Sequence, residues 1–120
     1  MTVGYVRDNL PRVILSLPGI TGNMTVEFIV DTGFDGELAL PSDLVNKLEV
    51  VYQGDKPILL AGGFARVQPG FEVVLEWEDE PRPTEILILE GVPLLGSVLL
   101  AGSLLQAEMT DGGEVLIEPL

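Results

Sequence analysis

The apolar segments of this chain are short, and Gly or Pro residues interrupt them at close intervals. Residues 12–17, for example, are followed by Pro18-Gly19, and residues 37–40 are followed by Pro41. Breakers at this spacing leave no room for long helices, and they are typical of strands that are joined by tight turns. The pattern therefore predicts an all-β domain.

The clearest strand pattern lies in residues 71–78, where Phe71, Val73, Leu75 and Trp77 alternate with mostly acidic residues. We expect the aromatic and aliphatic face of this strand to be buried and the other face to be exposed. The predicted strands cover residues 12–17, 24–30, 37–40, 50–52, 57–61, 64–68, 71–78, 85–89 and 115–117.

Two helices and one hairpin complete the local prediction. Ser42 is typical of the residue that caps the N-terminus of a helix, here one or two turns long. Residues 97–105 predict a second short and buried helix, although two glycines limit it. Gly62-Gly63 indicates a hairpin turn between the strand before it and the strand after it.

Composition limits both the size of the fold and its chemistry. The chain has 120 residues, 47% of them hydrophobic, and no linker divides it, so we expect one domain with a single core. It contains no Cys and no His. Disulfides, thiolate catalysis, His-dependent triads and most zinc sites are therefore excluded. Any acid–base chemistry depends on carboxylates or, less readily, on Lys or Tyr.

The charge excludes two classes of partner. Six basic residues against 19 acidic residues give a net charge of −13, which repels nucleic acid and anionic membrane surfaces. The uncharged residues 91–107 are interrupted by Pro and Gly and are fewer than the roughly 20 apolar residues of a membrane-spanning helix. The first residues lack the pattern of a secretory signal. We expect a cytoplasmic protein without nucleic-acid or membrane partners.

Asp31 is the strongest candidate for a catalytic residue. It follows the apolar residues 28–30 and precedes Thr32-Gly33. A carboxylate at the end of an apolar strand loses part of its hydration, and such a group is suited to acid–base catalysis. Thr32 can form local hydrogen bonds, and Gly33 permits a close backbone approach or a positive φ.

This motif has three other interpretations, two of which lack a feature that they require. Asp-Thr-Gly is good turn chemistry, so Asp31 can simply cap backbone amides. Asp31, Gly33 and Asp35 also match the start of a calcium-binding loop, but its twelfth position, which needs a bidentate Glu, is Ser42. Aspartyl-phosphate enzymes need a parallel α/β framework that this strand-rich chain does not predict. We expect no metal and no other cofactor.

Three segments, in this order, resemble the retropepsin-like aspartic proteases, especially their small single-domain prokaryotic branch. Residues 28–33 resemble the catalytic Asp-Thr/Ser-Gly turn with its preceding strand. The hairpin at residues 62–63 lies where the family carries its flap, and residues 94–96, Leu-Leu-Gly, resemble its second motif. The resemblance implies a closed β-barrel with one or two short helices and a flap hairpin, in a single domain over residues 1–120.

The resemblance also implies a mechanism. Asp31 would be half of a catalytic dyad, and the other half would come from a second copy in a homodimer, because the chain has one Asp-Thr-Gly. Two carboxylates in contact share one proton: one activates a water, and the other polarises the scissile carbonyl of a peptide or protein substrate. Thr32 would fasten the two turns, and Gly33 would leave room for the substrate backbone.

Further substrate contacts follow from the same resemblance. Phe34 would narrow the subsite beside the dyad, and Asp35 lies where many family members bind the substrate main chain. Gly62, Gly63 and Phe64 would close over the peptide as the flap. A cleft lined by Val, Leu and Phe predicts a preference for apolar residues around the scissile bond.

The implied function is that of an aspartic endopeptidase that depends on dimerisation. Residues 3–6 and 115–120 are the strands that we expect to contribute to the dimer interface. One alternative is a non-catalytic dimerisation or peptide-binding module of the same fold. Another is a protein that is active only when it is fused to, or bound by, another chain.

Overall fold

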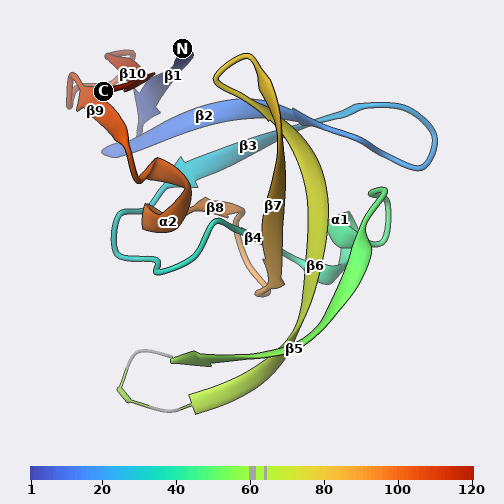
Figure 1. Cartoon of the computed structure of the whole chain (residues 1–120). Helices are drawn as coiled ribbons and strands as arrows, with labels where there is room; N and C mark the ends of the chain where they lie inside the picture. Colours follow the sequence, from blue (N-terminus) through green and yellow to red (C-terminus); the bar gives the residue numbers. More distant parts are fainter. Residues whose placement is uncertain (60–61, 64) are drawn as a thin grey trace.

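The fold is that of a computed structural model, which describes residues 1–59, 62–63 and 65–120 (Figure 1). Strands dominate this part of the chain, and its two helices have four residues each, so the prediction of an all-β fold is confirmed. The elements are β1 (Thr2–Arg7), β2 (Leu10–Leu17), β3 (Met24–Val30), β4 (Leu38–Leu40), α1 (Ser42–Val45), β5 (Val51–Leu59), β6 (Ala65–Trp77), β7 (Glu80–Ile88), β8 (Leu94–Leu95), α2 (Ser97–Leu100), β9 (Ser103–Ala107) and β10 (Glu114–Pro119).

The strands form one open sheet in the order β5-β6-β7-β4-β8-β3-β2-β1-β10-β9. The prediction of a closed barrel is therefore wrong for the described residues, in which β5 and β9 are the two edges. Closure requires the edge strands to pair. β5 and β6 instead project as a hairpin arm, which carries the edge of β5 far from β9 (Figure 1).

The hairpin arm joins segments that the sequence predicts as separate strands. β5 runs through Gly54 and Pro57 with one irregularity in its pairing, and β6 continues for 13 residues. Pro57 is tolerated because β5 is an edge strand, where a missing backbone donor costs no ladder hydrogen bond.

The core lies inside the curved sheet and is built mainly from alternating strand residues. Phe28, in the strand that precedes Asp31, is fully buried. In β6, Val73, Leu75 and Trp77 are buried whereas Val74 is exposed, so the predicted alternation is confirmed. Burial of this apolar face fixes the register of β6 against β7, because a slip of one residue would expose it.

The helix prediction for residues 97–105 is wrong beyond its first turn. α2 ends at Leu100, Gly102 takes a φ of 83°, and β9 begins directly afterwards. Glycine adopts this φ without strain, and the residues that follow it gain backbone pairing with β10. In α1, Pro41 occupies the N-cap position, and Ser42 is the first helical residue.

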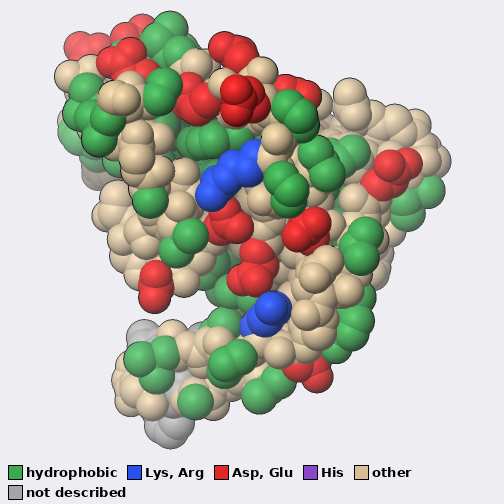
Figure 2. All heavy atoms as spheres, in the orientation of Figure 1, with side chains coloured by type: hydrophobic (Ala, Val, Ile, Leu, Met, Phe, Trp, Pro, Cys, Tyr) green, Lys and Arg blue, Asp and Glu red, His purple; other side chains and the backbone are tan. Residues whose placement is uncertain are grey.

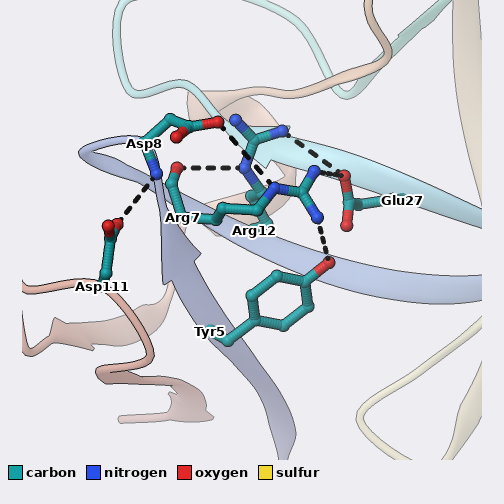
Figure 3. A network of polar contacts seen from close by, with 6 residues as sticks. All are labelled: Tyr5, Arg7, Asp8, Arg12, Glu27 and Asp111. Carbon is teal, nitrogen blue, oxygen red and sulfur yellow. Dashed lines mark hydrogen bonds and ion pairs between the residues drawn. The ribbon is translucent and has the colours of Figure 1, made fainter.

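An ion-pair network attaches the β1–β2 hairpin to β3 (Figure 3). Arg7 Nη2 lies 2.9 Å from Glu27 Oε2, and Arg12 Nη1 lies 3.4 Å from the same oxygen. At the hairpin turn, the Asp8 N–H donates to Asp111 Oδ1 at 3.0 Å. Two of the six basic side chains of the protein are used here to hold strands together.

A second polar contact connects α1 with the end of β7. The Ser42 N–H donates to Glu90 Oε1 at 3.2 Å, and hydrogen bonding from the Ser42 side chain and backbone lowers the pKa of the Glu90 carboxyl below 4.5. A carboxyl whose pKa is lowered by folding stabilises the protein above its unfolded pKa, and this contribution disappears as the pH falls through the folded pKa.

We therefore expect Glu90→Gln to lower the melting temperature near neutral pH, by an amount that shrinks once the pH falls below the ordinary Glu value of 4.5. Melting curves of the two proteins between pH 3 and pH 7, followed by circular dichroism, measure this difference. A difference that grows towards acid pH would contradict the assignment.

No helix in the described part of the chain combines the length and the apolar character that crossing a lipid bilayer requires.

Candidate active site

Asp31 lies directly after β3, at a point where the sheet brings in a distant segment. β8 pairs in parallel with β3, with Val30 opposite Leu95, and antiparallel with β4, with Leu38 opposite Leu95. The Asp31 N–H donates to the Leu95 carbonyl oxygen at 2.8 Å. The two predicted motifs, Asp-Thr-Gly and Leu-Leu-Gly, are therefore hydrogen-bonded to each other.

The chain turns tightly at Asp31. The Gly33 N–H donates to Asp31 Oδ1 at 2.9 Å, and the Phe34 N–H donates to the Asp31 carbonyl oxygen at 3.1 Å. Asp31 is half-buried, whereas Thr32 and Gly33 are exposed. The turn thus fixes the carboxylate through one oxygen and leaves the tip of the turn accessible to a second molecule.

Phe34 anchors this turn to the segment that follows β8. Its carbonyl oxygen accepts hydrogen bonds from the Ser97 N–H at 2.9 Å and from Ser97 Oγ at 3.1 Å. Its ring lies over Gly36 and Gly96, because a Cβ placed on either glycine would lie 2.6 Å from a ring carbon. Both positions require glycine for this close packing, so the geometry of the Asp31 turn depends on residues far along the chain.

A cleft of about 410 Å³ opens beside the turn, between it and the hairpin arm. Figure 2 shows a hollow between the arm, at the bottom of the view, and the body of the molecule, with acidic and basic side chains at its inner end. Its volume lies within the range of roughly 300–1,000 Å³ that small-molecule sites occupy. The cleft is lined by Phe34 and Asp35, by residues 56–59 of β5, and by Glu85, Leu87 and Leu89.

The arrangement of charge in the cleft depends on Gly70. Lys56 Nζ lies 3.8 Å from Glu85 Oε2, although β6 separates their two strands. The stem of Lys56 passes over Gly70, where a Cβ would lie 2.7 Å from Lys56 Cγ. A side chain at position 70 would block this path, so a glycine in β6 allows the ion pair to form.

Glu37 connects the loop that carries Asp35 with strand β7. Its Oε1 accepts the Glu85 N–H at 3.0 Å, and its Oε2 lies 2.8 Å from Arg82 Nη2. Because Glu37 follows Asp35 by two residues, these contacts attach the Asp35 loop to the strand that carries Glu85.

A second hollow, also of about 410 Å³, lies against the same hairpin arm. It shares Leu89 with the first, so the two hollows adjoin along the inner side of the arm. The lining of the second hollow is Arg66, Gln68, Ile88, Leu89, Glu90, Val92 and Leu94.

The structure brings together most of the predicted site residues. Asp31, Thr32 and Gly33 share one turn but do not belong to the cleft lining, which Phe34 and Asp35 reach. Gly62 and Gly63 have φ values of 88° and 83° and lie beyond the β5–β6 ladder, as the hairpin prediction requires. The predicted flap residue Phe64 lies outside the described residues.

Sequence patterns did not identify the residues that the sheet contributes to the cleft. Lys56, Glu85, Leu87 and Leu89 all line it. Glu85 and Leu87 alternate in β7, and Leu89 follows the end of this strand at the same spacing, so a period of two was the available signal that they share a face. Lys56 carried no comparable signal, because its contact with Glu85 depends on the register of three strands.

The polar groups of the site determine which chemistry is accessible. Within residues 1–59, 62–63 and 65–120, no three His, Cys, Asp or Glu side chains lie close enough to hold a metal ion. One chain supplies one Asp-Thr-Gly carboxylate, close in sequence to Phe34 and Asp35 of the partly apolar cleft.

No family model matches the chain, and neither the curated proteins nor the solved structures contain a significant match.

Proposed function

We propose that this protein is a homodimeric, retropepsin-like aspartic endopeptidase that acts in the cytoplasm. The observation that carries the proposal is the hydrogen bond from the Asp31 N–H to the Leu95 carbonyl oxygen, which joins the two motifs of the resemblance. The turn that begins at Asp31 continues into Phe34 and Asp35, which line the cleft. The hairpin arm supports the proposal, because residues 56–59 of its strand β5 line the cleft together with Phe34 and Asp35.

The chemistry requires two protomers. Two Asp31 carboxylates in contact hold one proton between them, because two adjacent negative charges are strongly disfavoured. The ionised Asp31 takes a proton from a water, which attacks the peptide carbonyl carbon, and the protonated Asp31 donates a hydrogen bond to the carbonyl oxygen. The exposed Thr32 and Gly33 leave the turn free to meet its copy.

The pairing of the terminal strands limits which strand edge is available to a second protomer. β1 and β10, which the sequence analysis expects at the interface, pair with each other within one chain, with Thr2 opposite Ile117. The unpaired edge of β9, next in the sheet after β10, is therefore the edge that we propose for a second protomer. An exposed strand edge is a ready template for pairing with another chain.

The direct test is incubation of the protein with a complex peptide mixture between mildly acidic and neutral pH, followed by mass spectrometry of the products. New termini that form with wild-type protein and not with Asp31→Asn support an endopeptidase. Absence of cleavage by a confirmed wild-type dimer would overturn the proposal.

One observation favours the non-catalytic alternative. Asp31 Oδ1 accepts the Gly33 N–H, which is what a purely turn-forming Asp does. In a dimerisation or peptide-binding module, Asp31→Asn would leave both the turn and peptide binding intact, and no cleavage would occur with either protein.

Self-association should depend on ionic strength and pH. Each protomer carries a net charge of −13, so two protomers repel each other at neutral pH and low salt. We expect the dimer to be roughly tenfold tighter in 0.5 M salt, or at mildly acidic pH, than in dilute neutral buffer. Analytical ultracentrifugation and peptidase assays across salt and pH check this. Tighter association in alkaline, low-salt buffer would contradict it.

A further inference from the structure

The cleft beside Asp31 combines an aliphatic surface with carboxylates. Leu87 in β7 and Leu89 just after the end of β7 supply apolar lining, and Glu85 lies two residues before Leu87 on the same strand. Asp35 lines the cleft from the loop and is exposed. A long side chain with an aliphatic stem and a cationic end matches both kinds of lining.

The charges of the cleft do not cancel. Lys56 and Glu85 form a loose pair at 3.8 Å, in which each side chain is 39% exposed, so water and ligands reach both groups. Asp35 takes part in no ion pair in the part of the chain that the structure describes. The cleft lining therefore carries two carboxylates and one ammonium group, in a protein whose overall charge already attracts cations.

We infer that this cleft selects a lysine or arginine side chain of the peptide, with Asp35 and Glu85 as the specificity-determining carboxylates and Lys56 as the residue that limits the preference. The inference rests on the proposed function, since it names the substrate class of that same cleft. The aliphatic stem lies along Leu87 and Leu89, and the cation approaches Asp35 and the outer face of Glu85. The expected apolar preference then applies to the other subsites.

The test measures binding separately from cleavage. Asp31→Asn protein is titrated with fluorescent synthetic peptides in which each position in turn is Lys, Arg, norleucine or Glu, and anisotropy gives the Kd. At one position we expect the Lys and Arg peptides to bind about twofold to fivefold more tightly than the norleucine peptide, which retains the stem without the charge. The Glu peptide should bind most weakly.

Charge substitutions made in the Asp31→Asn protein test whether this preference comes from the cleft. Asp35→Asn and Glu85→Gln should each reduce the preference, and Lys56→Gln should increase it. The fold of the Glu85→Gln variant is protected, because Glu37 binds the backbone N–H of residue 85 rather than its side chain. Asp43→Asn and Lys47→Gln, which make equal charge changes at exposed positions around α1, should leave the preference unchanged.

The outcomes separate this inference from the proposed function. The inference would be overturned if norleucine peptides bound as tightly as Lys and Arg peptides, or more tightly, at every position, or if Glu peptides were preferred. It would also be overturned if the control variants Asp43→Asn and Lys47→Gln changed the preference as much as the cleft variants do. Cleavage of the same peptides by wild-type protein is measured in parallel. Cleavage without a basic preference rejects the inference alone, whereas basic-selective binding without cleavage supports the inference and rejects the peptidase.

Discussion

Replacing Asp31 with Asn should lower the rate of peptide cleavage by about 10³-fold or more, because both the base and the acid of the proposed dimeric site are lost together. The fold should survive this change. An Asn side chain retains the oxygen that accepts the Gly33 N–H at 2.9 Å, so the turn keeps its hydrogen bond. Initial rates on a cleaved peptide, together with matching circular dichroism spectra and sedimentation of the two proteins, measure the effect.

Mixed dimers of wild-type and Asp31→Asn chains test whether both Asp31 residues are required. If wild-type and Asp31→Asn chains are unfolded and refolded together in known ratios, activity should fall as the square of the wild-type fraction, since each site needs two intact Asp31 residues. A linear decrease would show that one chain is sufficient and would exclude the dyad. Asp43→Asn, an exposed Asp in α1, is the matched control and should leave activity unchanged in all mixtures.

Gly96→Ala should reduce both stability and activity. A Cβ at this position would lie 2.3 Å from the Gly36 carbonyl oxygen and 2.7 Å from the Phe34 carbonyl oxygen, so the backbone on either side has to move. Overpacking of this kind costs about 1–3 kcal/mol of unfolding free energy. Since Phe34 follows the Asp31 turn, a displacement of about 1 Å there should lower the cleavage rate by about 10²-fold.

Ser97→Ala is the graded control for this prediction. It removes the hydroxyl contact with the Phe34 carbonyl oxygen at 3.1 Å but keeps the backbone contact at 2.9 Å. The loss should be about 0.5–1.5 kcal/mol in urea denaturation, with a smaller change in activity than Gly96→Ala produces. A Gly96→Ala protein that is as stable and as active as wild type would contradict the packing that is described here.

Local patterns were sufficient for the parts of the site that lie close together in the chain. The apolar run before Asp31 and the turn chemistry of Thr32-Gly33 predicted the end of β3, and the structure has that strand end at Val30. Alternation in residues 71–78 predicted the buried face of β6, because every second residue of a strand lies on the same face. Both signals depend only on the period of a strand and on the φ preferences of turn residues.

Pairings between distant strands could not be derived in the same way. The contact of Lys56 with Glu85 requires the registers of β5, β6 and β7 together, and an empty position at Gly70. The closed barrel was a wrong prediction because closure requires two edge strands to pair, and the residue pattern within each strand does not specify whether β5 and β9 meet. The helix at residues 97–105 was overextended because leucines at helical spacing also suit a strand next to β10.

The junction between β3 and β8 also affects how the protein is made. Ile29 pairs with Leu94 and Val30 with Leu95, so on a growing polypeptide the Asp31 turn leaves the ribosome long before its partners do. Pairings between residues so distant in sequence form late and slowly during folding. A nascent chain therefore carries the Asp31 turn without its β8 partner for much of translation, and the site that we propose can form only after residues 94–95 have been made.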